Sequence, residues 1–388
     1  MAPADIPAPL LRRIRRKLLV WYDRNRRDLP WRRTKDPYAI WLSEVMLQQT
    51  QVAMAIPYYQ RFLSRFLTIR DLAAADLDEV LRLWAGLGYY ARARSLHKAA
   101  KAVVESYGGR LPRRAEELRR LPGFGRYTAG AVASVAFGQR AAAVDGNAVR
   151  VLARLFDVRA DVRRGGGLDA VWESAERLVP PKQPGDWNQA VMELGAVVCL
   201  PGKAARCGQC PLRAECASLA AGTVAELPKR AKKQAVRIET HVVAAIETAG
   251  RFLFVKRPAK GLWGGLWELP SVVLTDGRSP RAAAGDLASE MLGEPVRSEP
   301  QPFCDLRRQL THRTIRFVGY RCRAKTLEGH PPRQQRPPRR SDARWLYLAE
   351  SESLGCSQGM RQVIARLRDH SISAATCATT ERCRASRL

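Results

Sequence analysis

Apolar positions recur at intervals of three and four residues through the first 220 residues, and they begin to alternate only after residue 237. The first pattern predicts helices and the second predicts strands. We expect a hairpin that turns at Ala249-Gly250, and near the end of the chain a strand over 314–322. Helices are expected over 10–25, 40–55, 72–84, 91–109, 115–121, 128–137, 149–156, 168–179, 281–292 and 357–369.

The change of pattern predicts two domains, because 388 residues are enough to bury two hydrophobic cores. We expect a mostly helical domain over 10–221 and an α+β domain over 238–370. Residues 222–237 are small, basic and poorly periodic, which is typical of a linker. The polar residues 371–388 predict a disordered tail.

The charge balance is strongly basic, with 66 Lys and Arg against 37 Asp and Glu and a formal net charge of +29. Such an excess indicates a polyanionic partner, although the arginine-rich composition of proteins from a GC-rich genome would account for part of it. No apolar run approaches the ~20 residues of a membrane span, and the first residues, MAPADIPAPL, lack a signal-peptide pattern. We therefore expect a protein of the bacterial cytoplasm, associated with the nucleoid and without a membrane partner.

A glycine hairpin, Leu121-Pro122-Gly123-Phe124-Gly125, lies between two of the predicted helices. Glycine permits positive φ in a tight turn and leaves backbone N–H groups uncovered. Those groups lie at the start of the following helix, where an anion such as a phosphate is favoured. An ordinary helix–turn–helix corner is the alternative interpretation of this stretch alone.

Two carboxylates are candidates for chemistry. Glu44 shares a polar stripe with Gln48 and Gln51 on the helix predicted over 40–55, which suits either a solvated surface or the lining of a cleft. In a cleft, partial desolvation would raise the pKa of Glu44. Asp145 precedes the apolar helix over 149–156, where an aspartate commonly caps the helix. Capping and catalysis are compatible roles for it.

Four of the nine cysteines form the pattern C-x7-C-x2-C-x5-C. In an intracellular protein, thiols this close in sequence predict a metal centre and not a disulfide framework. The chemistry of four thiolates leaves a zinc site and an iron–sulfur cluster both open. The four candidate ligands are Cys199, Cys207, Cys210 and Cys216.

From about residue 10 to residue 368, the chain resembles the adenine DNA glycosylases of the MutY type. The segments that carry the resemblance are SEVMLQQT, LPGFGRYTAG, VDGNAVRVLAR, the cysteine pattern and GLWGGLWELP. The resemblance implies a helical helix-hairpin-helix glycosylase domain with an iron–sulfur loop over 199–216, followed by a Nudix-like lesion-recognition domain. It also implies a [4Fe–4S] cluster on the four cysteines, although the family usually has six residues between the first two cysteines and this chain has seven.

The resemblance implies base excision repair: hydrolytic removal of adenine paired with 8-oxoguanine or guanine in double-stranded DNA, by a monomer. Glu44 would be the catalytic acid and Asp145 the anion that stabilises the sugar cation, with Tyr127 and Asn147 in support. Trp31, Arg32, Gln189 and Glu193 would line the adenine pocket, and Gln49, Thr50, Leu87 and Tyr89 would face 8-oxoguanine. Gly123 and Gly125 would hold phosphates, and Thr311 and His312 would belong to the recognition loop of the second domain, where Leu310 replaces the family's phenylalanine.

Tyr127 bears on the type of reaction. Relatives of the endonuclease III type carry a lysine at this position, and its amine attacks the sugar and nicks the strand. Tyrosine cannot form an imine, so we expect a monofunctional glycosylase that leaves an abasic site. The alternatives are a lyase of the endonuclease III type and a non-enzymatic helix-hairpin-helix DNA binder. The second domain offers only Glu290 and Glu294 where a Nudix hydrolase needs a glutamate cluster, which argues against pyrophosphatase activity.

Overall fold

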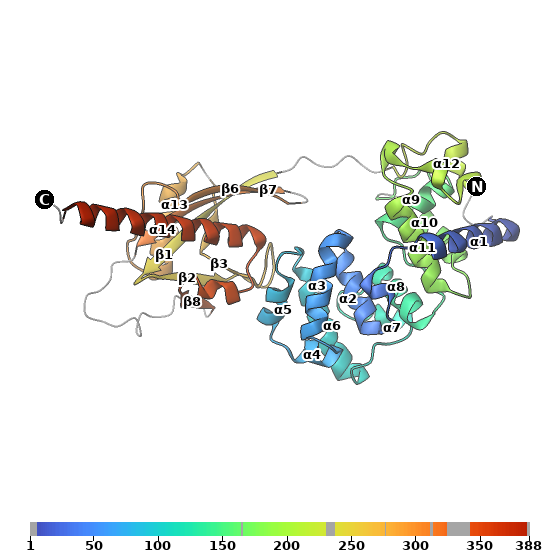
Figure 1. The fold of residues 1–388 in the computed structure, drawn as a ribbon, viewed down its shortest axis with the longest axis horizontal. Coiled ribbons are helices and arrows are strands. Elements are labelled where there is room, and N and C mark those ends of the chain that lie inside the picture. The colour runs from blue at the N-terminus through green and yellow to red at the C-terminus, as the bar shows by residue number, and fades with distance from the viewer. Residues whose placement is uncertain are drawn as a thin grey trace. The chain divides into compact units, whose positions relative to one another are not determined.

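The computed structural model describes residues 6–163, 166–229, 237–275, 277–310, 313–323 and 342–385. Its contacts divide the chain into two compact units. The helical unit comprises Met1–Ala75 and Arg94–Lys233, and the sheet unit comprises Asp76–Ala93 and Gln234–Leu388. Both are drawn in Figure 1. The expected fold class, a mostly helical domain followed by an α+β domain, is confirmed.

The helical unit consists of α-helices joined by short loops, with single 3-10 turns near the cysteines. Its elements are α1 (Ala8–Asn25), η2 (Pro30–Arg32), α2 (Pro37–Leu47), α3 (Val52–Arg65), α4 (Ile69–Ala74), α6 (Ala91–Tyr107), α7 (Ala115–Leu118), α8 (Arg126–Phe137), α9 (Gly146–Leu155), α10 (Gly167–Leu178), α11 (Pro184–Val197), η3 (Gly202–Ala204), η4 (Cys207–Gln209), η5 (Arg213–Glu215) and α12 (Ala217–Ala220).

The small residues of α8 are explained by its central position. Its stretch Thr128–Val135 is buried, and the helix packs against α2, α7 and α11. A Cβ added at Gly130 would lie 1.9 Å from the carbonyl oxygen of Ala142, so only glycine permits this backbone approach. Around α9 and α11, apolar side chains of α1 and α10 complete the core of this unit.

The helix predicted over 40–55 is wrong, because the chain breaks between α2 and α3. Gln48 ends α2, Gln49 has a left-handed φ of 58°, and Gln51 precedes α3. The side chain of Gln48 donates a hydrogen bond to Thr128 Oγ1 of α8, at 3.2 Å. Of the predicted polar stripe, Glu44 therefore stays on α2, whereas Gln48 and Gln51 flank the loop between the two helices. Pro57 lies inside α3.

The sheet unit contains, among its described residues, an eight-stranded sheet in which β1 and β7 pair in parallel at the centre. The main path is β3-β2-β1-β7-β5, and β4, β6 and β8 pair with β1, β7 and β2 respectively. Its elements are α5 (Leu77–Trp84), β1 (Arg237–Thr248), β2 (Arg251–Lys256), β3 (Trp267–Glu268), β4 (Ser271–Val273), α13 (Pro280–Leu292), β5 (Arg297–Ser298), β6 (Cys304–Gln309), β7 (Arg313–Arg323), β8 (Ala343–Leu346), η7 (Glu350–Ser353) and α14 (Gln358–Ala385).

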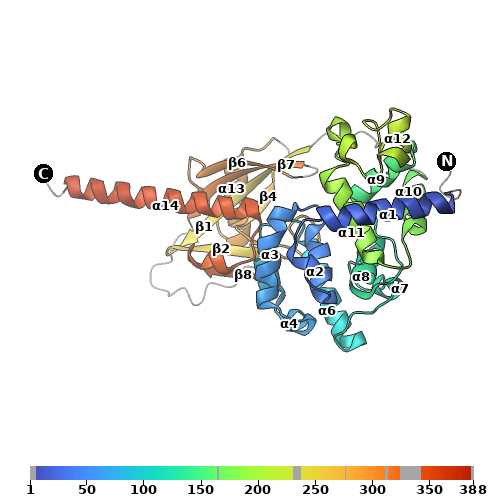
Figure 2. The ribbon, with the colours of Figure 1, turned by 45° about the vertical axis from the view of Figure 1, so that its right-hand side comes forward.

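The sheet is apolar on both faces. Along β1, Val243 and Ala245 pack with one cluster of side chains that includes the start of α14, whereas Val242 and Ile246 pack with another that includes α13. This alternation is the period-two pattern of a strand covered on both sides. Figure 2 shows α14 extending beyond the sheet. The helix continues to Ala385, over most of the segment for which the sequence predicts a disordered tail.

Asp76–Ala93 are continuous in sequence with helices of the helical unit, yet they group with the sheet unit. Part of the predicted linker, residues 230–236, lies outside the described residues. None of the helices in the described ranges has both the length and the apolar character that a membrane crossing requires.

Candidate active site

A cavity of about 740 Å³ opens in the helical unit where α2, α8, α9 and α11 meet. Its lining includes most of the side chains that the resemblance implicates. They are Trp31, Arg32, Glu44, Gln49, Thr50, Gly123, Gly125, Tyr127, Asp145, Asn147, Gln189 and Glu193. Residues from both ends of the helical domain are therefore brought to one cavity, and their individual roles stay predictions.

Glu44 lies on α2 and is only 7 % exposed. Burial raises the pKa of its carboxyl group to about 7, and the charge of Asp145 acts in the same direction. The Tyr127 hydroxyl donates a hydrogen bond to Glu44 Oε2, and this contact and Arg32 favour the ionised form. A carboxyl group with a pKa near 7 can deliver a proton at neutral pH.

Asp145 caps the N-terminus of α9, and its carboxylate has several donors. Its Oδ1 accepts a hydrogen bond from the Ala148 N–H at 2.7 Å, and its Oδ2 accepts one from Asn147 Nδ2 at 2.9 Å. Burial raises the pKa of Asp145, whereas these hydrogen bonds and the charge of Arg150 oppose the rise. The donors hold the carboxylate at the cavity wall, so capping and presentation to the cavity coincide.

The charges of both acids act on the Tyr127 hydroxyl. Burial raises the pKa of its hydroxyl far above the ordinary range, and the charges of Glu44 and Asp145 add to the rise. The hydroxyl also contacts the sulfur of Met192 at 3.5 Å. Tyr127 therefore remains a neutral donor, and the position holds no amine.

A network of arginines and one glutamate forms another wall of the cavity. Glu193 on α11 is 1 % exposed and accepts hydrogen bonds from Arg27 at 2.7 and 2.9 Å and from Arg32 at 2.8 Å. Burial raises the pKa of Glu193, but these arginines outweigh it and lower the pKa to about 2. Arg32 also donates to Gln189 Oε1 at 3.2 Å. Glu193 is thus held ionised, whereas Glu44 can exchange its proton near neutral pH.

The glycine hairpin lies beside the carboxylates. Gly123 has the expected left-handed φ, 78°, and a Cβ there would lie 2.6 Å from Ser95 Cβ. Gly125 differs from the expectation, because its φ is −81° and it precedes α8 as the N-cap residue. A Cβ at Gly125 would meet nothing within 4 Å, so its glycine identity leaves the backbone at the start of α8 uncovered.

The described lining of this cavity does not include Leu87 or Tyr89. Leu87 and Tyr89 belong to the sheet unit, where Tyr89 is 41 % exposed with a left-handed φ of 49°. Thr311 and His312 follow β6 and lie outside the described residues.

Sequence reasoning missed Arg150 on α9. Its guanidinium donates to Asn147 Oδ1 at 2.8 Å, to the Gly195 carbonyl at 2.7 Å and to the Cys199 carbonyl at 2.6 Å. Arg150 is only 9 % exposed. Its hydrogen bonds connect Asn147, the partner of Asp145, to Cys199, the first cysteine of the pattern. Its burial is what marks Arg150 as a site residue, and burial of one arginine cannot be recognised in a sequence with 66 Lys and Arg.

The four cysteines line one small cavity together with Arg154, Val198, Arg206, Arg213, Leu219 and Val224. Arg154 is 1 % exposed, and it donates to Cys199 Sγ at 3.3 Å and to the Leu200 carbonyl at 2.7 Å. Burial raises the pKa of Cys210 to about 12, and the neighbouring cysteines add to the rise. Metal binding requires the thiolate form, so a positively charged group among these cysteines would have to offset the raised pKa. Across the described part of the chain, no cluster of three or more His, Cys, Asp or Glu side chains has the arrangement that would hold a single metal ion.

Comparison with known proteins defines the class. Residues 42–165 match the family model of the helix-hairpin-helix (HhH-GPD) superfamily of base excision DNA repair proteins, and residues 241–366 match the NUDIX domain. A thermostable thymine-DNA glycosylase of known structure is 32 % identical, with a TM-score of 0.50, over 54 % of this chain and 97 % of that one. The chain is thus a helix-hairpin-helix DNA N-glycosylase, a hydrolase, with a Nudix-like C-terminal domain.

The relatives identify the family more closely. The adenine DNA glycosylase of Homo sapiens is 39 % identical over 90 % of this chain and 73 % of its own length. That of Rattus norvegicus is 37 % identical over 95 % of this chain and 79 % of its own length. The chain belongs to the adenine DNA glycosylase family.

Proposed function

We propose that this protein removes adenine paired with 8-oxoguanine or with guanine in double-stranded DNA by hydrolysing the N-glycosidic bond. The observation that carries the proposal is the pair of acids at one cavity: Glu44, with a pKa of about 7, and Asp145, held by two hydrogen-bond donors. Loss of a purine requires protonation of the leaving base and a negative charge near the sugar cation, and two such carboxyl groups supply both.

The steps assigned to the side chains are these. The adenine leaves the base stack and enters the cavity, because its ring nitrogens are inaccessible within a duplex. Glu44 donates its proton to N7, the bond from the base to the sugar breaks, and Asp145 stabilises the resulting oxocarbenium ion. Water then adds to the sugar carbon, with the ionised Glu44 placed to accept its proton. Tyr127 keeps Glu44 oriented through the hydroxyl hydrogen bond.

The reaction ends at an abasic site. Tyr127 occupies the position at which a lysine nucleophile would act, and the pKa of its buried hydroxyl is too high for it to serve as an anionic nucleophile. The other cationic groups at the cavity, Arg27 and Arg32, are bound to Glu193. We therefore infer a monofunctional enzyme.

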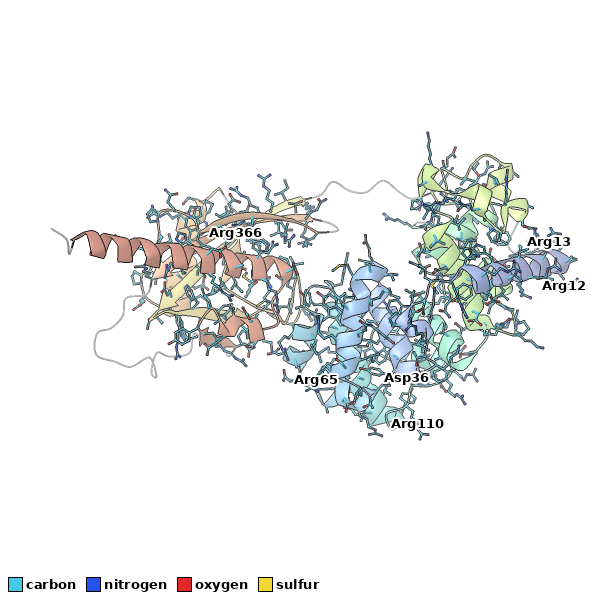
Figure 3. The ribbon with its side chains drawn as sticks, in the orientation of Figure 1. Arg12, Arg13, Asp36, Arg65, Arg110 and Arg366 are labelled. Atoms are coloured by element: carbon cyan, nitrogen blue, oxygen red, sulfur yellow. The ribbon has the colours of Figure 1, made fainter. Side chains whose placement is uncertain are left out.

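The walls of the cavity suit a flipped adenine. Trp31 is buried at the wall and packs edge-on against Tyr59, with ring centroids 5.4 Å apart. Gln189 and Glu193 offer amide and carboxylate groups for the edge of the base. Gln49, Thr50, Leu87 and Tyr89 would face the opposite base. The exposed arginines, of which Figure 3 labels Arg12 and Arg13 on α1, Arg65 at the end of α3 and Arg366 on α14, would contact phosphates without selecting a sequence.

We propose that Cys199, Cys207, Cys210 and Cys216 hold a [4Fe–4S] cluster. A bound cluster would cross-link Cys199, which follows α11, to the three cysteines of the loop that contains η4 and η5. Arg154 would hydrogen-bond the Cys199 thiolate and fix the loop through its carbonyl contacts.

We infer that the enzyme acts on DNA as a monomer.

A single-turnover assay on a duplex with adenine opposite 8-oxoguanine tests the function. We expect strand breaks only after alkali treatment, since the enzyme would leave an intact backbone at the abasic site. Glu44→Gln should lower the excision rate by roughly a hundredfold or more, the range for loss of a general acid, while duplex binding is kept. Full excision by this variant, or strand breaks without alkali, would contradict the proposal.

A further inference from the structure

The segment Asp76–Ala93 carries two residues assigned above to the opposite base, Leu87 and Tyr89, and it packs with the sheet unit. Its helix α5 is amphipathic, with Val80, Leu81 and Trp84 buried and Asp76 as its N-cap. The contacts of this segment with β2, β3 and the chain before α14 involve specific polar groups, which we call the loop anchor: Asp78, Tyr90, Lys256, Trp267 and Cys356.

Asp78, in the first turn of α5, has two partners from the sheet. Its Oδ1 forms an ion pair with Lys256 Nζ of β2 at 2.6 Å. Its Oδ2 accepts a hydrogen bond from Trp267 Nε1 of β3 at 3.1 Å. Trp267 is 3 % exposed, so its indole N–H would be left without an acceptor if Asp78 moved away.

Tyr90 makes the second attachment, at the other end of the segment. Its ring is 5 % exposed, and its hydroxyl donates to the Cys356 carbonyl at 3.3 Å. The backbone there leaves no spare room, since a Cβ at Gly355 would lie 3.3 Å from Leu81 Cβ. Cys356 in turn pairs with Trp267 as an isolated bridge, so both attachments reach one part of the sheet unit.

Between these attachments, the loop Gly86–Tyr90 has a constrained backbone. The φ values of Gly86, Gly88 and Tyr89 are 111°, 74° and 49°. The carbonyl of Gly88 accepts hydrogen bonds from Trp84 Nε1 and from Arg92 Nη2, each at 3.1 Å. A left-handed tyrosine is strained and persists only when its surroundings hold it. The loop anchor is part of those surroundings.

We propose that the C-terminal domain positions the Gly86–Tyr90 loop through the loop anchor, and that Asp78, Tyr90 and Lys256 are positioning residues for discrimination of the base opposite adenine. The inference rests on the proposed function, because it takes Leu87 and Tyr89 to face that base. It adds to the C-terminal domain a role separate from any direct contact with the lesion: the domain holds a loop that the helical part of the sequence supplies.

Lys256→Met gives the sharpest test, because it removes the charge facing Asp78 and keeps most of the aliphatic side chain. Tyr90→Phe is the second variant, and it removes only the hydroxyl. Asp305→Asn is the matched control, since it breaks another ion pair of the sheet unit, that of Asp305 with Arg316, outside the loop anchor. All are made in the full-length protein and compared by two measurements.

The first measurement is amide hydrogen exchange of residues 86–93, which needs no assumption about the substrate. We expect faster exchange in Lys256→Met and Tyr90→Phe and wild-type exchange in Asp305→Asn. The second is the ratio of single-turnover excision rates for adenine opposite 8-oxoguanine and opposite guanine. We expect both anchor variants to lower this ratio roughly three- to tenfold, the effect of losing one charged or hydrogen-bonded contact, with Asp305→Asn unchanged.

Unchanged exchange in both anchor variants would overturn the positioning role. Faster exchange with an unchanged ratio would overturn its link to discrimination, while the proposed function would stand. Absence of adenine excision by the wild-type protein would instead refute the proposed function, and the discrimination role of the loop anchor would fall with it.

Discussion

At the scale of single residues, the cavity separates two glutamates by their surroundings. Glu44 has the Tyr127 hydroxyl as its hydrogen-bond donor, and burial raises its pKa to about 7. Glu193 has Arg27 and Arg32 as partners, and its pKa falls to about 2. At neutral pH Glu193 is therefore ionised, whereas Glu44 can both donate and accept a proton. Such a separation of pKa values is what distinguishes the roles of carboxyl groups in one site.

The raised pKa of Glu44 predicts a dependence of stability on pH. A carboxyl group whose pKa is higher in the folded protein stabilises the fold below its unfolded value of 4.5, and this contribution is lost as pH rises through about 7. At pH 8 the ionised Glu44 should cost about 3 kcal/mol relative to pH 4. Glu44→Gln does not titrate, so its Tm should exceed that of wild type by an amount that grows from pH 5 to pH 8.

Thermal unfolding of both proteins across this range measures the effect, and Asp305→Asn controls for a general change of charge. A Tm difference that stays constant with pH would mean that Glu44 is not desolvated in the folded protein. A more stable variant without excision activity would also exclude misfolding as the reason for the lost activity.

Asp145 offers a separation of its two roles. Asparagine caps helices about as well as aspartate. Its amide oxygen can still accept the hydrogen bond from the Ala148 N–H, whereas its NH2 group cannot accept the one from Asn147 Nδ2. Asp145→Asn should therefore cost about 1 kcal/mol of stability, the value of one hydrogen bond, while the excision rate falls by roughly a hundredfold or more because the negative charge near the sugar is lost. Single-turnover rates and melting curves measured together provide the test. If stability and activity were lost together, Asp145 would act only as the N-cap of α9 and not in catalysis.

Local sequence could predict these acids and the side chains that bond them directly, Tyr127 and Asn147, but not the buried arginines around them. SEVMLQQT and VDGN identify Glu44 and Asp145, since the resemblance is carried by short unbroken segments. Arg27, Arg150 and Arg154 become recognisable only from their burial and from carbonyl or carboxylate partners distant in the sequence. In a chain with 66 Lys and Arg, no local pattern distinguishes a buried arginine from a surface one.

At the scale of elements, the break after α2 shows where helical periodicity fails. No glycine or proline interrupts Leu47–Val52, and apolar residues stand on both sides of it, so the sequence predicts one helix over 40–55. In the structure the helix ends instead after Leu47. The Gln48 amide donates a hydrogen bond to Thr128 of α8, and Gln49 has a left-handed backbone conformation. The break brings Gln49 and Thr50 to the cavity lining, as an uninterrupted helix would not. Strain at that point is consistent with a functional loop.

The cysteine loop gives an element-scale prediction. Cys210→Ser should lower bound iron and the visible absorption of the iron–thiolate group, and it should destabilise the loop over 199–216, because one ligand of the cluster is lost. Cys304→Ser is the matched control, a buried cysteine of the sheet unit that should leave the iron content unchanged. Iron analysis and absorption spectra of both purified variants decide the matter. Bound zinc in place of iron, or equal iron in both variants, would contradict the cluster assignment.

At the scale of the whole molecule, the sequence predicts the two kinds of domain correctly because periodicity changes once, near residue 237. It could not predict that Asp76–Ala93 group with the sheet unit, since the loop anchor joins residues far apart in sequence. The apolar pattern of α5 predicts only that one face is buried, and not against which partner. The same limit holds for any helix whose partner lies in another domain of the sequence.

This grouping changes what removal of the C-terminal domain means. A protein ending at residue 236 would lose the predicted recognition loop with Thr311 and His312, and it would also lose Lys256 and Trp267, the partners of Asp78. We expect its preference for 8-oxoguanine over guanine to fall further than in Lys256→Met or His312→Ala alone, because two contributions disappear together. Single-turnover rates for the three proteins and for the double variant measure this.

If recognition and positioning are separate, the free-energy effects of Lys256→Met and His312→Ala should add in the double variant, since independent contributions are additive. The double variant should then approach the truncated protein. A truncated protein no worse than His312→Ala would show that the C-terminal domain contributes contact with the lesion alone. One no worse than Lys256→Met would show that it acts only through the Gly86–Tyr90 loop.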